Sequence, residues 1–60
     1  MDIQGQLNNI ETNASNLKDL SEHFKEIGMD YVATKIDIQV NSIMANIWYI
    51  EGQLRERTNG

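Results

Sequence analysis

The sequence predicts an all-α fold: two antiparallel helices form a hairpin, and two hairpins associate as a homodimeric four-helix bundle. Apolar residues recur with the period of a helix along most of the chain, and one glycine-containing break divides the pattern near its middle. The chain has 60 residues and no cysteine, so a single hairpin would have too small a core and no disulfide to support it. We therefore expect one helical domain, residues 1–60, that completes its core by self-association.

The first helix is expected over about residues 3–27. Its apolar positions recur at alternating spacings of four and three residues, as in coiled coils, with one polar interruption. They are Ile3, Leu7, Ile10, Ala14, Leu17, Ser21 and Phe24. The asparagine, serine and threonine residues between positions 8 and 16 have poor helix propensity. We expect the first turns to fray, or the helix to begin only at Asn13.

The break falls at Gly28, because glycine readily adopts the left-handed conformation that ends a helix. Met29 is then expected to reach back to Phe24 across the turn. Asp30 suits the N-cap of a second helix, since its carboxylate can accept hydrogen bonds from the first turn. The loop is then two or three residues long, which makes the two helices antiparallel neighbours.

The second helix is expected over about residues 31–57, with a loose tail at residues 58–60. Its apolar positions continue the seven-residue spacing through Met29, Ala33, Ile36, Val40, Ile43, Ile47, Ile50 and Leu54. Arg55 and Arg57 suit the negative end of the helix dipole. We expect the oligomer core to consist of Ile36, Val40, Ile43, Ile47, Ile50, Leu54, Leu17 and Phe24.

Apolar residues outside this stripe form a candidate partner or dimer surface: Met44, Trp48 and Tyr49. If a second copy covers them, they belong to the dimer contact. If they are reserved for a foreign protein, they match the methionine and aromatic clusters that often mark binding surfaces. The sequence leaves both interpretations open.

No catalytic, cofactor-binding or metal-binding pattern is present, so we expect neither an enzyme nor a cofactor. The serines have no histidine or lysine at an informative spacing, and a hydroxyl without a base is a poor nucleophile; helix surface or cap positions are expected for them. His23 shares a helical face with Asp19 and Glu26, which is more typical of a solvated acidic face than of a metal site. The isolated glycines exclude a loop that cradles phosphate.

The charge balance argues against nucleic acid and membranes as partners. The formal net charge of −4 and the pI of about 4.6 repel phosphate backbones and anionic lipids. The apolar stretches are far shorter than the ~20 residues that span a bilayer. The first residues lack the basic and apolar regions of a signal peptide, and cysteine is absent, so a cytoplasmic location is expected.

In size and helical organisation, without a shared motif, the chain resembles the very small acidic helical proteins that bacteriophages and mobile elements encode to inhibit host factors, including anti-defence proteins. The small size, the surplus apolar surface, the acidic charge and the absence of catalytic groups predict a homodimer that binds and inhibits or bridges a larger protein, and the resemblance implies that this protein is a host defence or regulatory factor. One alternative is an oligomeric sponge for a nucleotide signal, and another is an acidic mimic of DNA. For the sponge, the only cationic candidates are Lys18, Lys25, Lys35, Arg55 and Arg57.

Overall fold

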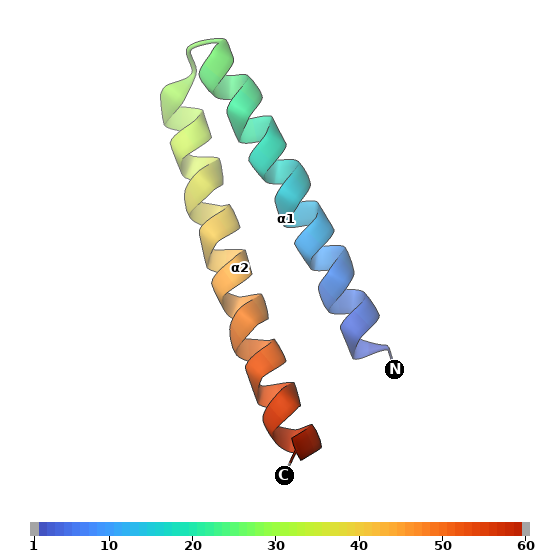
Figure 1. The fold of residues 1–60 in the computed structure, drawn as a ribbon. Coiled ribbons are helices and arrows are strands. Elements are labelled where there is room, and N and C mark those ends of the chain that lie inside the picture. Colours follow the sequence, from blue (N-terminus) through green and yellow to red (C-terminus); the bar gives the residue numbers. More distant parts are fainter. Residues whose placement is uncertain (1, 60) are drawn as a thin grey trace.

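The chain folds into two long antiparallel α-helices joined by a three-residue loop (Figure 1). The computed structural model describes residues 2–59, and the side chains of residues 2–57. Helix α1 spans Ile3–Glu26 and helix α2 spans Asp30–Asn59. The predicted all-helical hairpin is thus confirmed, whereas Met1 and Gly60, which the predicted domain includes, lie outside the described residues.

Helix α1 matches its expected range to within one residue, and α2 extends beyond its expected range at both ends. The Asp2 carboxylate caps α1 by accepting a hydrogen bond of 2.8 Å from the backbone N–H of Gly5. The helix therefore begins at Ile3 rather than at Asn13, because the cap and the packing against α2 outweigh weak propensity. At the other end, α2 continues through the expected tail to Asn59 and extends past α1 (Figure 1).

The loop closes α1 with a Schellman arrangement, as expected from Gly28. This glycine has a φ of 85°, in the left-handed region. Its N–H donates to the carbonyl of Lys25 at 3.1 Å, and the N–H of Met29 donates to the carbonyl of Phe24 at 2.8 Å. Asp30 is the first residue of α2 rather than its cap, so the capping position falls to Met29. The carboxylate of Asp30 still lies in the first turn, where the helix dipole favours negative charge.

One row of residues from each helix forms the core, termed here the inner seam. Ala14 and Ala33 are 1% and 0% exposed, so the two helices approach each other closely at these residues. The inner seam consists of Leu7, Ala14 and Ser21 on α1 and Ala33, Val40 and Ile47 on α2. Among the described residues, one hairpin therefore buries five apolar side chains, two of which are alanines.

Within residues 2–59, neither helix has a segment long and apolar enough to cross a membrane.

Candidate functional site

The inner seam separates two sides of the hairpin that differ in chemistry. On each helix, residues four after or three before a seam residue lie to one side of the seam. Lys18 and Lys25 of α1 both contact Asp37 of α2 on this side. Gln4 also contacts Glu51 across the two helices. This side is termed the charged flank, and it contains Gln4, Glu11, Lys18, Lys25, Asp30, Asp37, Met44 and Glu51.

The opposite side is the apolar flank, formed by residues three after or four before a seam residue. It consists of Ile3, Ile10, Leu17 and Phe24 on α1 and Ile36, Ile43 and Ile50 on α2. Exposed fractions reach 44% at Ile10 and 41% at Ile50, whereas the inner-seam residues do not exceed 7%. The apolar flank follows both helices along most of the hairpin, so its exposed apolar side chains form one continuous band rather than scattered positions.

A rim of uncharged residues borders the apolar flank. It consists of Gln6, Asn13 and Leu20 on α1 and Val32, Gln39, Asn46 and Gln53 on α2. None of the seven flank and seven rim positions carries a charge, although 23% of the chain is charged and an even distribution would place about three charges there. Water-exposed helix pairs usually carry glutamate or lysine beside their apolar stripe. The chain thus keeps charge away from the side on which its apolar residues are half exposed.

The charged flank holds an ionic cluster centred on Asp37. Its Oδ1 atom accepts a hydrogen bond of 2.7 Å from the Ser21 hydroxyl and lies 3.2 Å from Lys18 Nζ, while Oδ2 lies 3.2 Å from Lys25 Nζ. These hydrogen bonds, from Ser21 and then from Lys25 and Lys18, lower the pKa of Asp37 from 3.8 to about 2. The hydrogen bond with Asp37 in turn raises the pKa of Lys25. Three donors on α1 therefore converge on one carboxylate of α2, which helps to fix the register of the two helices.

Sequence reasoning missed this cluster. Serines were expected at the helix surface or at caps, but Ser21 is 0% exposed and its hydroxyl oxygen lies 3.2 Å from the carbonyl oxygen of Ala33. The available signal was the spacing of Lys18, Ser21 and Lys25, which are three and four residues apart and share one helical face. A buried serine hydroxyl between two lysines on a helix face needs a hydrogen-bond acceptor, which the facing helix can provide.

The structure divides the predicted oligomer core into two groups. Val40 and Ile47 lie in the inner seam, within a single hairpin. Leu54 is half-buried and continues the same row of α2 towards its end. The remaining predicted residues lie on the apolar flank: Leu17, Phe24, Ile36, Ile43 and Ile50.

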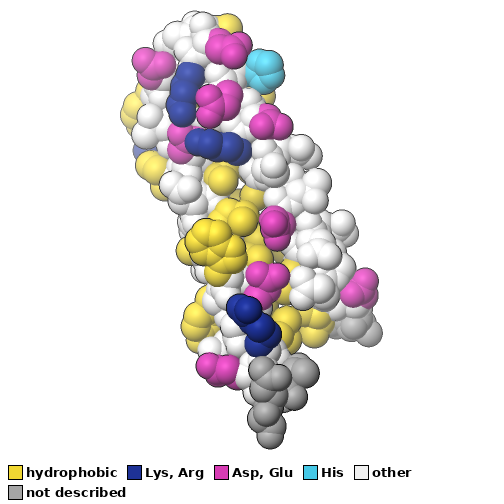
Figure 2. Space-filling view, in the orientation of Figure 1, with side chains coloured by type: hydrophobic (Ala, Val, Ile, Leu, Met, Phe, Trp, Pro, Cys, Tyr) yellow, Lys and Arg dark blue, Asp and Glu magenta, His cyan; other side chains and the backbone are white. Residues whose placement is uncertain are grey.

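The three residues of the candidate partner surface do not share one face. Met44 is half-buried, and Trp48, one turn further along α2 on the same side, is 63% exposed. Tyr49 is 69% exposed and lies about 100° further round the helix, on its outer face. Met44 and Trp48 therefore form the patch, without Tyr49. Figure 2 shows one face of the hairpin, with charged side chains gathered near the loop end and a hydrophobic patch further along.

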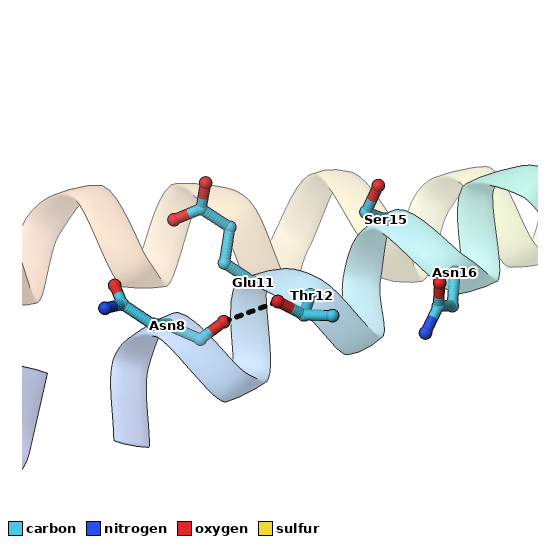
Figure 3. A pocket seen from close by; sticks show the side chains of 5 residues that line it. All are labelled: Asn8, Glu11, Thr12, Ser15 and Asn16. Atoms are coloured by element: carbon cyan, nitrogen blue, oxygen red, sulfur yellow. Dashed lines mark hydrogen bonds between the residues drawn. The ribbon is translucent and has the colours of Figure 1, made fainter. Parts of the chain in front are cut away.

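A shallow hollow on the outside of α1 offers little to a ligand (Figure 3). Its lining residues all belong to α1 and are all exposed: Asn8, Glu11, Thr12, Ser15 and Asn16. The Thr12 hydroxyl donates to the Asn8 carbonyl at 3.0 Å. Ligand sites normally enclose most of the ligand surface, which residues of one helix cannot do. No three histidine, cysteine or acidic side chains within residues 2–59 gather where they could hold a metal ion.

The fold and its surfaces define a small helical hairpin with one charged flank and one apolar flank. No protein-family model matches the sequence, and no significant match was found among curated proteins or solved structures. Function is therefore inferred from the chemistry of the two flanks.

Proposed function

We propose that this chain is a non-enzymatic interaction protein that acts as a homodimer, a four-helix bundle closed by two apolar flanks. The observation that carries the proposal is the half-exposed apolar flank with its uncharged rim. A core as small as that of one hairpin rarely supplies more than ~3–5 kcal/mol of net stability. Two apolar flanks placed face to face would turn half-buried isoleucine, leucine and phenylalanine side chains into a shared core.

The size of the apolar flank supports a stable dimer. Helix α1 has 24 residues, which at ~1.5 Å per residue gives a length of about 36 Å. Two adjacent helices are about 20 Å wide, so the face covers roughly 700 Å². A standard stable interface buries about 800 Å² on each partner. A second copy of the chain is therefore sufficient to cover the flank.

Such a dimer would leave the charged flank outside, where the Met44 and Trp48 patch lies. Exposed aromatic and methionine side chains are typical of binding hot spots. With a net charge of −4, the chain favours a protein partner that has a basic surface around an apolar pocket. A two-fold symmetric dimer would present two such patches and could inhibit or bridge a larger protein, as the phage and mobile-element inhibitors that it resembles act on host factors.

Two other roles have less support. A nucleotide sponge needs cations free to line a pocket, whereas Lys18 and Lys25 both contact Asp37. The hollow on α1 is open and is lined by a single helix. A DNA mimic needs a continuous acidic surface, and the same two lysines interrupt it.

The substitution Ile43→Asp tests the dimer. Ile43 lies at the middle of the apolar flank and outside the inner seam, so a carboxylate there prevents burial by a second copy. We expect a monomer in analytical ultracentrifugation and weaker helical circular dichroism. The matched control is Ile38→Asp on the outer face of α2, where the side chain is 55% exposed, and this variant should remain a dimer. A dimer that survives Ile43→Asp would contradict the proposal.

The partner-binding role is tested by affinity capture from host cells with three baits. The unmodified chain should retain a defined protein that Trp48→Ala loses, although this variant keeps the native mass of the dimer. Tyr31→Ala, on the outer face of α2 and 74% exposed, is the control and should retain the same protein. If Trp48→Ala captures the same protein as well as the unmodified chain does, the Met44 and Trp48 patch does not bind it.

A further inference from the structure

The rim of the apolar flank changes character along the hairpin. Ser21 lies opposite Ala33. Because the helices are antiparallel, a step of seven residues back along α1 and seven residues forward along α2 reaches positions at the same height along the hairpin axis, here called the same level. Rim residues of α1 and α2 therefore share levels within about 3 Å. We call the end of the hairpin that carries the two termini the open end. From the loop to the open end, the pairs that share a level are Leu20 and Val32, Asn13 and Gln39, and Gln6 and Asn46. The first pair is apolar and the other two are amides.

From this gradient we infer how the second copy docks, given the dimer proposed above: the two loops lie at the same end, about a two-fold axis parallel to the helices. Each α1 then lies beside α2 of the other copy. Each rim residue faces the residue of the same level across the interface, so Leu20 meets Val32 and Asn13 meets Gln39. Apolar side chains meet apolar ones, and each amide meets another amide that can both donate and accept.

Docking with the loops at opposite ends gives a poorer match. Each helix would then lie beside its own copy, running antiparallel to it. Leu20 would face Gln6, and Val32 would face Asn46, so two amides per copy would be buried against apolar side chains without a partner. Sliding the copies until Leu20 met itself would shift them by about 21 Å and uncover more than half of the apolar flank.

Charge does not oppose docking at the same end. The net charge of −4 divides evenly, with −2 in residues 15–41 near the loop and −2 in the rest of the chain. Neither end therefore has an excess that would push two loop ends apart. The pairing of the rim residues decides the orientation.

Disulfide formation between introduced cysteines tests the orientation, because the chain has no cysteine of its own. Asn13→Cys and Gln39→Cys are prepared separately, then mixed in denaturant, refolded together and oxidised. Docking at the same end predicts a covalent heterodimer in the mixture and no covalent dimer of either variant alone. Docking at opposite ends predicts the reverse, because Asn13 and Gln39 would each face their own copy. Glu11→Cys on the charged flank, mixed with Gln39→Cys, is the control and should form no disulfide.

The native mass of each variant, measured before oxidation, separates the two possible failures. If all variants and the unmodified chain are monomers, the dimer and its orientation are both refuted. If the variants are dimers but form disulfides only between two copies of the same variant, or form no disulfide, the orientation alone is refuted. The pair Gln6→Cys and Asn46→Cys repeats the measurement at the open end and guards against a local effect of either first substitution.

Discussion

Ile47→Ala measures how much the inner seam contributes to stability. The side chain is 2% exposed, and the substitution removes three carbon atoms from the core. At ~0.8 kcal/mol per buried methylene, the lost transfer free energy is about 2.4 kcal/mol. The cavity adds to this, since such substitutions cost ~2–5 kcal/mol in total, while the better helix propensity of alanine offsets a few tenths. We therefore expect the free energy of unfolding to fall by about 2–4 kcal/mol.

Ile38→Ala is the matched control, because it makes the same change in the same helix on the outer face. Ile38 is 55% exposed, so less than half of its transfer free energy is at stake, about 1 kcal/mol. Water fills the space left by the deleted atoms, so no cavity forms, and the gain in helix propensity brings the net loss below ~1 kcal/mol. Urea unfolding followed by helical circular dichroism compares the two variants. The protein concentration is held equal, since the stability of a dimer depends on it.

Equal losses in the two variants, or a larger loss for Ile38→Ala, would refute the reasoning. Either result would mean that the outer face of α2, rather than the inner seam, is buried in the folded protein. The helices would then be rotated relative to the arrangement described above.

Because hydrogen bonding lowers the pKa of Asp37 from 3.8 to about 2, the ionised cluster adds stability that is present above pH 3.8 and is lost as the pH falls towards 2. The free energy of unfolding should therefore depend less on pH in this window in Asp37→Asn than in the surface control Glu56→Gln. Equal slopes of the unfolding free energy against pH in the two variants would mean that the cluster does not cause this pH dependence. Gly28→Ala should lower stability by about 1 kcal/mol because its φ is 85°, whereas Gly52→Ala, inside α2 with nothing within 4 Å of the added Cβ, should raise it by up to ~1 kcal/mol. Thermal unfolding checks both glycines, and shifts of the same sign would contradict the assigned turn. Trp48→Ala should cost at most about 2 kcal/mol in urea unfolding, because 63% of the side chain is already exposed; a loss above ~3 kcal/mol, as for a core tryptophan, would mean that another chain buries it.

The two helices and the turn between them can be predicted from local sequence features. The seven-residue spacing places apolar residues on one stripe of each helix, and Gly28 supplies the one turn that the spacing allows. The shift of the second cap from Asp30 to Met29 is a difference of one residue, which propensity cannot resolve. Asp2 caps α1 and so offsets the weak helix propensity of the following turns, a role that the apolar spacing does not predict.

The division into inner seam and apolar flank could not be read from spacing. Both rows repeat every seven residues, and which row faces the other helix depends on how each helix is rotated about its axis. Small residues gave a partial signal, because Ala14, Ser21 and Ala33 allow the close approach that larger side chains prevent. Ser21 interrupts the apolar pattern, and the spacing alone does not predict its burial, because its hydrogen-bond acceptor on Asp37 comes beside it only in the folded hairpin.

Sedimentation equilibrium of the unmodified chain over a concentration series tests the central claim most directly. One chain has a mass of 6.9 kDa. If the apolar flanks close a bundle, the helical protein sediments with twice that mass, and any dissociation at high dilution is accompanied by loss of helical circular dichroism. A fully helical species with the mass of one chain at every concentration would contradict the account.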